Sequence, residues 1–336
     1  MRIVIISDSL TLTHSEKVNE RIESHHKLVI ESITSAIANF GHDVVSIVAD
    51  DELKEQVQKN KPHIVFNRSI KEANQSGLAY TPSLLDKLHI PYTGSSAEVC
   101  ISAFNKNKTK RILQEAGIPT SKSCLISDSG EIRIPNTLSF PLFIKPIEGG
   151  CSYGIYDKNL VLSVESCIKN VKAIIEETQK PVLVEEFLTG REFTVGIVGN
   201  NPPQAFPILE FIYDTFENQN YQFRSFKTKM IEGRGEKKSC PAILSEIEED
   251  KIKKLAIDTY RTIGCRDYAR IDIRCNKYSI PHILEVNALP SLIPHRSSFA
   301  DMAETAGYSF ENLIGAILIS AFERYDIHFR HEDYHS

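Results

Sequence analysis

The chain has 336 residues, a formal net charge of −5, and 41% hydrophobic and 25% charged residues, a balance typical of a soluble globular protein. This charge does not suggest a nucleic-acid-binding surface, and no stretch approaches the roughly 18 apolar residues of a membrane span. The seven cysteines are scattered singly, which favours free thiols in a reducing cytoplasm over a zinc site. We therefore expect a cytoplasmic protein with two or three compact lobes.

The first hundred residues alternate between apolar strands and helices, beginning with a strand at residues 2–7 rather than a signal peptide. Two further strands are predicted at 44–49 and 63–67, with helices over Lys27–Phe40 and Pro82–Leu88 and a short helix before the third strand. Strands separated by helices indicate a small parallel sheet with crossover helices.

The middle of the chain begins with a predicted helix over Asn105–Ala116, which ends at Gly117, a common helix-stop signal. Short strands then dominate, and only one further helix is expected before residue 190. These later elements are strands at 123–127, 140–146, 153–157 and 181–187, and a helix over Val164–Thr178.

The remaining residues predict a larger mixed unit, with strands at 193–199 and 204–211 and a closing helix over Ser309–Arg324. Within it, the polar segment Tyr213–Ser239 has about 25 residues, which is too long for an idle connection in a compact domain. We interpret this segment as a mobile lid over an active site, with a plain surface insertion as the alternative.

The segment 268–290 predicts two strands of alternating apolar residues joined by a polar turn. The alternation places Arg270 and Asp272 on one face of the first strand, and Glu285 and Asn287 on one face of the second. If the strands pair, three oxygen-bearing side chains and an arginine converge. Such oxygens suit Mg²⁺, which proteins hold with one or two carboxylates plus substrate phosphates. The alternative is a set of solvated or salt-bridged carboxylates.

Three other motifs are typical of nucleotide binding. Lys145 ends an apolar strand and precedes a glycine-rich turn, where backbone N–H groups could approach phosphate oxygens, although an ordinary turn is the alternative. The strand that ends in Glu185 and Glu186 could present backbone groups and carboxylates to adenine and ribose, or could simply be a solvated strand end. Lys106 begins the helix before Gly117, and the other lysines of this helix, Lys108 and Lys110, are expected to face solvent.

Together these motifs resemble the ATP-grasp ligases, and specifically the D-alanine–D-alanine ligase branch, from about Ile90 to Leu318. The segments that carry the resemblance follow in the family's order and spacing: IPYTGSS, NKNKTK, FIKPIEGGCSYGI, VLVEEFLTGREFTVGIVG, CPAIL, GCRDYARIDI and ILEVNALP. The resemblance implies an α/β, three-lobed ATP-grasp fold. Its parts would be an N-terminal Rossmann-like domain (1–100), a central subdomain (101–190), a C-terminal catalytic domain (191–330) and a tail (331–336).

The resemblance also implies a role for individual residues. ATP and Mg²⁺ would be the cofactors, with two metal ions for which Mn²⁺ could substitute. The implied contacts are Lys106 and Lys145 to the phosphates, Glu185, Glu186 and Leu188 to the adenine, Glu192 to the ribose, Asp272, Glu285 and Asn287 to the metal ions, and Arg270 to the transferring phosphoryl group.

The departures from the family pattern fall in the amino-acid half of the site. The lid retains a lysine, Lys229, but Met230 stands where the family has tyrosine. Cys151 replaces the first serine of the Gly-Ser-Ser turn, while Ser152 is kept. Lys229 and Ser152 therefore join Arg270 as candidate catalytic residues, and Cys151 is expected only to pack the turn.

Three further departures concern substrate binding. Ser291 stands at the glycine whose N–H helps to form the oxyanion hole, and Arg296 replaces a serine that binds the acceptor's carboxylate. The segment FNRSIKEANQSG, which contains Arg68, replaces the family's HG…GEDG loop. Because a guanidinium fork matches a carboxylate, Arg296 and Arg68 are candidate substrate anchors, with ordinary salt bridges as the alternative.

The implied activity is an ADP-forming ligation, in which a carboxylate or vinylogous acid is phosphorylated and then joined to the amine of an amino acid. The specific versions left open are a mycosporine-like amino acid ligase that forms an imine with mycosporine-glycine, an L-amino-acid dipeptide ligase, and a D-alanine–D-alanine ligase. The acceptor could thus be a carboxylate or an enaminone. A noncatalytic nucleotide-binding protein is the alternative from another class. The family's habit implies a homodimer.

Overall fold

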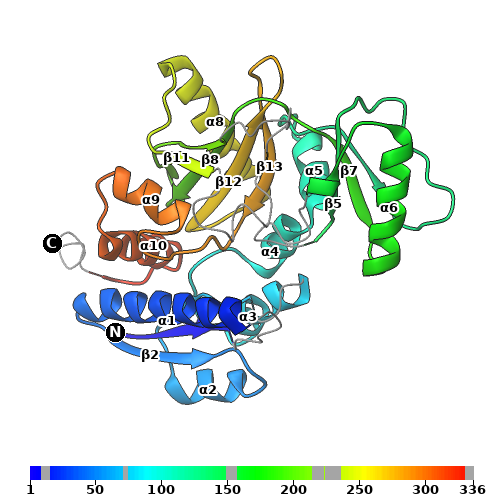
Figure 1. Ribbon diagram of the computed structural model, residues 1–336. Helices are drawn as coiled ribbons and strands as arrows, with labels where there is room; N and C mark the ends of the chain where they lie inside the picture. The colour runs from blue at the N-terminus through cyan, green and yellow to red at the C-terminus, as the bar shows by residue number, and fades with distance from the viewer. Residues whose placement is uncertain (9–15, 71–74, 149–156, 214–222, 224–235, 330–336) are drawn as a thin grey trace.

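The computed structural model describes the chain except for residues 9–15, 71–74, 149–156, 214–222, 224–235 and 330–336. Its helices and strands form a mixed α/β arrangement with three separate β-sheets (Figure 1). Among the described residues, no helix is long and apolar enough to cross a membrane.

The first sheet is parallel, with the strand order β2-β1-β3. Its elements are β1 (Arg2–Ser7), α1 (Glu16–Asn39), β2 (Asp43–Val48), α2 (Leu53–Asn60), β3 (Ile64–Asn67) and α3 (Gln75–Lys87). Ile3 and Ile5 of β1 pack with α1, whereas Val4 and Ile6 pack with α2 and α3. All four side chains are fully buried because helices cover both faces of the sheet.

Helix α1 also joins this sheet to the C-terminal part of the chain. Its residues Ile33 and Ile37 pack in the same core as Ile314 and Ile317 of α10 (Phe310–Arg324). In Figure 1, α1 accordingly lies between the first sheet and α10. The N-terminal and C-terminal parts of the chain therefore share one apolar core.

The second sheet is antiparallel, with the strand order β4-β7-β5-β6. Its elements are β4 (Ser123–Ile126), β5 (Leu142–Pro146), a 3-10 turn (Asp157–Asn159), β6 (Leu160–Val161), α6 (Val164–Thr178) and β7 (Val182–Glu186). Val171 and Ile175 of α6 pack on one face of the sheet. Because side chains alternate along a strand, Phe143, Lys145 and Glu185 belong to the opposite face.

The third sheet is antiparallel, with the order β11-β10-β8-β12-β13 and β9 paired to β8. Its strands are β8 (Glu192–Val198), β9 (Gln204–Ala205), β10 (Leu209–Tyr213), β11 (Glu236–Ser239), β12 (Tyr268–Cys275) and β13 (Pro281–Asn287). Helix α8 (Glu246–Ile263) covers one face, where Ile252 and Tyr260 share a core with Val195 and Ile271. Helix α9 (Ser298–Thr305) follows β13.

Two short helices link the first sheet to the other two. Asn105 ends α4 (Ala97–Phe104) and begins α5 (Lys106–Glu115), and its Oδ1 accepts a hydrogen bond from the Lys108 N–H at 2.9 Å. The Lys106 N–H donates to the Ile147 carbonyl at 2.9 Å, just after β5. This bond fixes the start of α5 beside the end of β5.

The predicted strands and helices that fall on described residues occur in the expected order, but several boundaries differ. Helix α1 begins at Glu16, well before the predicted Lys27, and the run 204–211 is divided between β9 and β10. Helices α4, α8 and α9 have no counterpart in the sequence prediction. Most of the strand predicted at 153–157 lies outside the described residues.

Candidate active site

The hairpin of β12 and β13 brings the four predicted polar residues together. The antiparallel register places Arg270 opposite Asn287, and Asp272 opposite Glu285. The register then shifts after Asp272, so that Arg274 lies opposite His282. The convergence expected from the alternation of residues is therefore present in the structure.

Asp272 is the centre of this group. Arg270 donates from Nε to Asp272 Oδ1 and from Nη2 to Oδ2, at 2.9 Å each. Thr194 Oγ1 donates to Oδ1 at 2.6 Å, and Asn287 Nδ2 donates to Oδ2 at 3.0 Å. The side chains of Arg270 and Asp272 are 15% and 19% exposed, so they are accessible to a ligand.

The donor set fits the expected Mg²⁺ ions. It offers two carboxylates, Asp272 and Glu285, and the amide oxygen of Asn287, all of which are hard oxygen ligands. The described residues contain no cluster of three or more His, Cys, Asp and Glu that could hold a metal unaided. A site with two carboxylates is the kind that binds Mg²⁺ together with the phosphates of a nucleotide.

Lys106 and Lys145 lie close together where the start of α5 meets the end of β5. Lys145 is half-buried at the end of β5 and pairs with Glu185 of β7. Burial lowers the pKa of Lys106, while the nearby carboxylate of Glu285 raises it and the ammonium of Lys145 lowers it further. Lys106 therefore lies close to both a predicted metal ligand and the other predicted phosphate ligand.

Lys110 does not face solvent, contrary to the sequence-based expectation. Its side chain is 3% exposed, and its Nζ lies 2.8 Å from Glu185 Oε2, whereas Lys108 is exposed as predicted. Nζ also donates to Ser121 Oγ at 2.6 Å and to Thr120 Oγ1 at 2.9 Å. Lys110 lies one helical turn after Lys106, on the same face of α5, and that spacing was the signal for its burial.

The bonds around Lys110 connect the second sheet to the hairpin. Thr120 Oγ1 donates to the carbonyl of Ile283 on β13 at 2.9 Å, two residues before Glu285. Ser121 Oγ donates to Glu185 Oε2 at 3.0 Å. Burial alone would raise the pKa of Glu185, but Lys110 and Lys145 outweigh it and lower the pKa to about 2. Glu185 is therefore a carboxylate between two ammonium groups.

The other residues predicted to contact adenine and ribose also have protein partners. Glu186 Oε1 accepts a hydrogen bond from the Ser139 N–H at 2.8 Å, and the Leu188 side chain is buried. Glu192 Oε2 accepts from Arg274 Nη1 at 2.7 Å, and these two side chains are 10% and 7% exposed. The structure thus places Glu192 in a buried ion pair rather than on an open surface.

An aromatic group that was not predicted from the sequence lies beside these residues. The rings of Phe143 and Phe187 stack with centroids 5.7 Å apart, and Phe223 contacts both edge-on at 4.7 and 6.0 Å. The Arg274 guanidinium carbon lies 4.5 Å from the Phe187 ring centroid. Phe143 could have been found because it shares the face of β5 that carries Lys145.

The predicted substrate residues occupy the junction with the first sheet. Arg68, after β3, donates from Nη1 to the hydroxyl of Tyr268 at 3.1 Å and to the Pro290 carbonyl at 3.0 Å. Exposed Arg296 lies with Nη1 at 2.9 Å from Nε2 of His25 on α1. Ser291 is half-buried next to Pro290.

Some predicted site residues lie outside the part of the chain that the structure describes. These are Lys229 and Ser152 among the candidate catalytic residues, and also Cys151, Met230 and the glycines of the turn after β5. Most of the predicted lid, Tyr213–Ser239, is likewise outside it, although Tyr213 ends β10 and 236–239 form β11.

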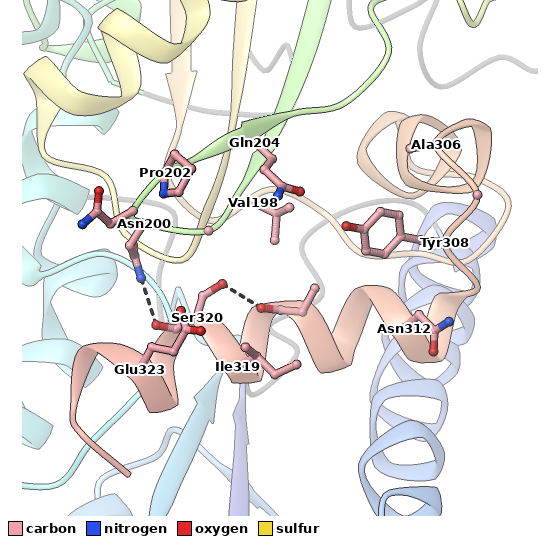
Figure 2. Close-up of a pocket in the computed structure, with 14 residues that line it drawn as sticks. Val198, Asn200, Pro202, Gln204, Ala306, Tyr308, Asn312, Ile319, Ser320 and Glu323 are labelled. Atoms are coloured by element: carbon pink, nitrogen blue, oxygen red, sulfur yellow. Dashed lines mark hydrogen bonds between the residues drawn. The ribbon is translucent and has the colours of Figure 1, made fainter. Parts of the chain in front are cut away.

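A separate cavity of about 500 Å³ lies between the β8–β9 turn and helices α9 and α10 (Figure 2). Its lining includes Asn200, Gln204, Tyr308 and Asn312. Asn200 Nδ2 donates to the Ser320 carbonyl at 2.9 Å across its floor. None of the residues predicted to act in the site lines this cavity.

Comparisons with known proteins agree with this geometry. The family model for the C-terminus of D-Ala D-Ala ligase matches residues 112–319. A D-alanine–D-alanine ligase of Desulforamulus reducens is 32% identical over 310 residues, covering 88% of this chain and 93% of that one. An uncharacterized protein of Sinorhizobium fredii, y4sG, is 28% identical over 305 residues, covering 88% of each chain.

The crystal structure of D-alanine–D-alanine ligase from Bacillus anthracis complexed with ATP has a TM-score of 0.74 to this chain, at 20% identity. The match covers 97% of this chain and 99% of that one, so the two share a fold and the expected ATP-grasp architecture is confirmed. The chain therefore belongs to the D-alanine–D-alanine ligase family of ATP-grasp enzymes, which are ADP-forming ligases that make C–N bonds.

Proposed function

We propose that this chain phosphorylates a carboxylate, or an equivalent acid oxygen, of one small molecule and joins it to the amine of an amino acid. The observation that carries the proposal is the arrangement of Arg270, Asp272, Glu285 and Asn287 on facing strands, with Lys106 beside them. Binding a nucleotide without turnover would not require a complete set of oxygen ligands together with an arginine.

ATP and Mg²⁺ are the cofactors of this family. Asp272, Glu285 and Asn287 would hold Mg²⁺, which supplies positive charge to the nucleotide phosphates. Lys106 and Lys145 would add two cations at the same phosphates, since Lys145 lies at the end of β5 and Lys106 lies close to both Lys145 and Glu285. The residues thus provide the neutralisation that phosphoryl transfer needs, with no protein nucleophile.

The end of β7 supports an adenine site. The N–H groups of Glu186 and Phe187 donate to the carbonyls of Lys122 and Pro141 at 2.9 Å each. The next N–H, that of Leu188, makes no hydrogen bond with the described residues, so it is available to a ring nitrogen. The stacked rings of Phe143 and Phe187 offer an apolar wall beside it.

Arg270 would act on the transferring group. In the structure both of its donor nitrogens on one edge hold Asp272. When Asp272 ligates a metal, that edge of Arg270 can turn to the phosphoryl oxygens. A substrate carboxylate oxygen then attacks the γ-phosphorus, the bond to ADP breaks, and an acyl phosphate forms. The amine attacks the acyl carbon, loses a proton, and phosphate leaves.

The amino-acid half of the site supports a partner other than a second D-alanine. Arg296 is exposed and faces α1, where the family pattern has a serine. Because the relative from Desulforamulus reducens is a D-alanine–D-alanine ligase, D-alanine is nevertheless the first substrate to test. A homodimer and a cytoplasmic location complete the proposal, and light scattering of the purified chain tests the former.

Trapping with hydroxylamine tests the activity without knowledge of the amine, since it converts an acyl phosphate to a hydroxamate. Mg²⁺-ATP, hydroxylamine and a panel of acids should give ADP and hydroxamate in equal amounts with particular acids only. The panel would contain D- and L-amino acids, dicarboxylic acids and a glycine-substituted cyclohexenone. For the cyclohexenone, the release of phosphate is measured in place of hydroxamate. Asp272→Asn should bind ATP and fail to turn over. A wild-type chain that binds ATP but releases no ADP with any acid contradicts the proposal.

A further inference from the structure

In the described part of the chain, one guanidinium nitrogen of Arg68 holds it at the junction of the first sheet and the hairpin. Nη1 donates to the Tyr268 hydroxyl at 3.1 Å and to the Pro290 carbonyl at 3.0 Å. Tyr268 precedes Arg270 by two residues on β12, and Pro290 follows Asn287 by three residues on the chain after β13. The guanidinium is therefore fixed to the strands that carry the predicted metal site.

The other edge of Arg68 makes no hydrogen bond with the part of the chain that the structure describes. Nε is buried and has no hydrogen-bond partner, and among the described residues no carboxylate lies within ion-pair distance of the guanidinium. A buried donor without an acceptor is costly, so native proteins rarely leave one unless a ligand or water fills the place. The Nε–H and an Nη2–H of arginine point in the same direction and match the two oxygens of a carboxylate.

His26 on α1 adds a second unpaired group. Its Nε2 is buried and has no hydrogen-bond partner. Burial lowers the pKa of His26, and the charges of Asp8 and Arg68 are close enough to act on it. The nearby acid, Asp8, is engaged elsewhere, because its Oδ1 accepts from Ser69 Oγ and the Ile70 N–H at 2.7 Å each.

The position of this group favours a ligand. Asp8 and Arg68 directly follow β1 and β3, and ligands of open parallel sheets bind at the carboxyl ends of the strands. Tyr268 and Arg270 point to the same face of β12, about 7 Å apart along the strand. A small acid could therefore reach from the edge of Arg68 to the phosphoryl site at Arg270.

We propose that the free edge of Arg68, with His26 beside it, binds a carboxylate of the acid that the ligase activates, so that this acid carries a second carboxylate besides the one that is phosphorylated. The inference rests on the proposed function and narrows its substrate class to dicarboxylic acids. The free edge of Arg68 presents N–H donors and a positive charge, which match a carboxylate and disfavour the ammonium of an amino acid.

The test compares dicarboxylic acids with their monoamides in the hydroxylamine assay. The probes are succinate, glutarate, L-aspartate and L-glutamate, each paired with the amide of one carboxylate. At least one diacid should react with a kcat/KM roughly 10- to 100-fold above that of its monoamide, as loss of a charged hydrogen bond implies. Arg68→Lys, which keeps the charge but loses the fork, should reduce this ratio at least tenfold, mainly through the KM of the diacid.

Arg133→Lys is the matched control, because this arginine is exposed and, among the described residues, its ion-pair partner is the nearby Glu131. Arg133→Lys should leave the ratio of kcat/KM between diacid and monoamide unchanged. Circular dichroism should show that both variants are folded. If Arg68→Lys does not fold, the melting temperature of the wild-type protein in Mg²⁺-ADP is measured instead of the activity of the variant. Glutarate or succinate should raise this melting temperature, and their monoamides should not.

Two results overturn the inference in different ways. Monocarboxylic acids that react as well as diacids, with a ratio insensitive to Arg68→Lys, leave the ligase standing and refute the second-carboxylate site. ATP binding without ADP release from any acid refutes the proposed function and the inference together.

Discussion

Lys110 and Glu185 form an ion pair of 2.8 Å in which both side chains are 3% exposed. Glu185 also pairs with Lys145 of β5, and Lys110 also donates to Thr120, which in turn donates to the Ile283 carbonyl of the metal-site hairpin. The pair therefore links the strands that would hold the nucleotide to the strand that would hold Mg²⁺.

Removal of the Lys110 charge should destabilise the protein strongly. Lys110→Met leaves the buried Glu185 carboxylate with the Ser121 hydroxyl and one ammonium partner, Lys145. Loss of one partner of a buried ion pair costs about 3 to 5 kcal/mol. Urea unfolding measures the change. Lys108→Met is the matched control on the exposed side of the same helix, where a change within about 0.5 kcal/mol is expected. Equal unfolding free energies for Lys110→Met and Lys108→Met would contradict a stabilising ion pair between Lys110 and Glu185.

The same carboxylate should make stability depend on pH. Lys110 and Lys145 lower the pKa of Glu185 from 4.5 to about 2. Because the pKa of Glu185 is lower in the folded state than in the unfolded state, its carboxylate stabilises the folded protein. This stabilisation is complete above pH 4.5 and is lost as the pH falls toward 2. A shift of this size corresponds to on the order of 3 kcal/mol.

Glu185→Gln provides the comparison, because glutamine does not titrate. The unfolding free energy of the wild type minus that of Glu185→Gln should decrease between pH 6 and pH 3. A difference that stays constant over this range would show that Glu185 has an ordinary pKa in the folded state.

Glu192 and Arg274 should be strongly coupled. Their side chains are 10% and 7% exposed and lie 2.7 Å apart, so each single substitution leaves a buried charge without its partner. Glu192→Gln and Arg274→Met should each destabilise the protein. The double variant should lose less unfolding free energy than the two single variants lose together. A double-mutant cycle in urea should give a coupling of at least about 1 kcal/mol. Additive losses would mean that the pair does not form in solution.

Gly190, just before β8, should not accept a side chain. A Cβ there would lie 2.7 Å from the Cys275 carbonyl oxygen and 2.8 Å from that of Asn276, and both are backbone atoms. Gly190→Ala should therefore cost at least about 2 kcal/mol, the middle of the range for overpacking. At Gly196 the nearest atom is Cδ2 of the Phe206 side chain at 2.8 Å, which can shift more easily. If thermal melts showed a smaller loss of stability for Gly190→Ala than for Gly196→Ala, the predicted backbone clash at Gly190 would be wrong.

The hairpin was predictable because its signal is local. Period-two alternation fixes the faces of Arg270, Asp272, Glu285 and Asn287, and a short polar turn leaves antiparallel pairing as the simple solution. Helix α8 was missed although Ser245 and Glu248 form a capping box, which is a sequence-level signal of a helix start.

The partners of the charged residues were not predictable in the same way. The alternation of residues puts Arg274 on the same face as Arg270 and Asp272. Its pairing with Glu192, however, depends on β8 lying next to β12, and that order comes from the tertiary fold. Likewise, Lys110 and Glu185 are 75 positions apart in the chain, and only the packing of α5 against the end of β7 brings them together.

Metal dependence gives a further check of the donor set. Removal of divalent ions with EDTA should abolish ADP release, and Mg²⁺ or Mn²⁺ should restore it, because the site offers hard oxygen ligands. Glu285→Gln should raise the Mg²⁺ concentration needed for half-maximal activity. Activity that persists in EDTA would contradict the assignment of Asp272, Glu285 and Asn287.

Oxygen transfer tests the central claim most directly. An acid that supports hydroxamate formation would be labelled with ¹⁸O in the carboxylate and incubated with unlabelled Mg²⁺-ATP and hydroxylamine, and the released phosphate would be analysed by mass spectrometry. Attack of the carboxylate on the γ-phosphorus predicts one ¹⁸O atom in each phosphate. Phosphate that carries no label would mean that water, not the acid, attacks ATP, and would contradict the proposed ligase chemistry.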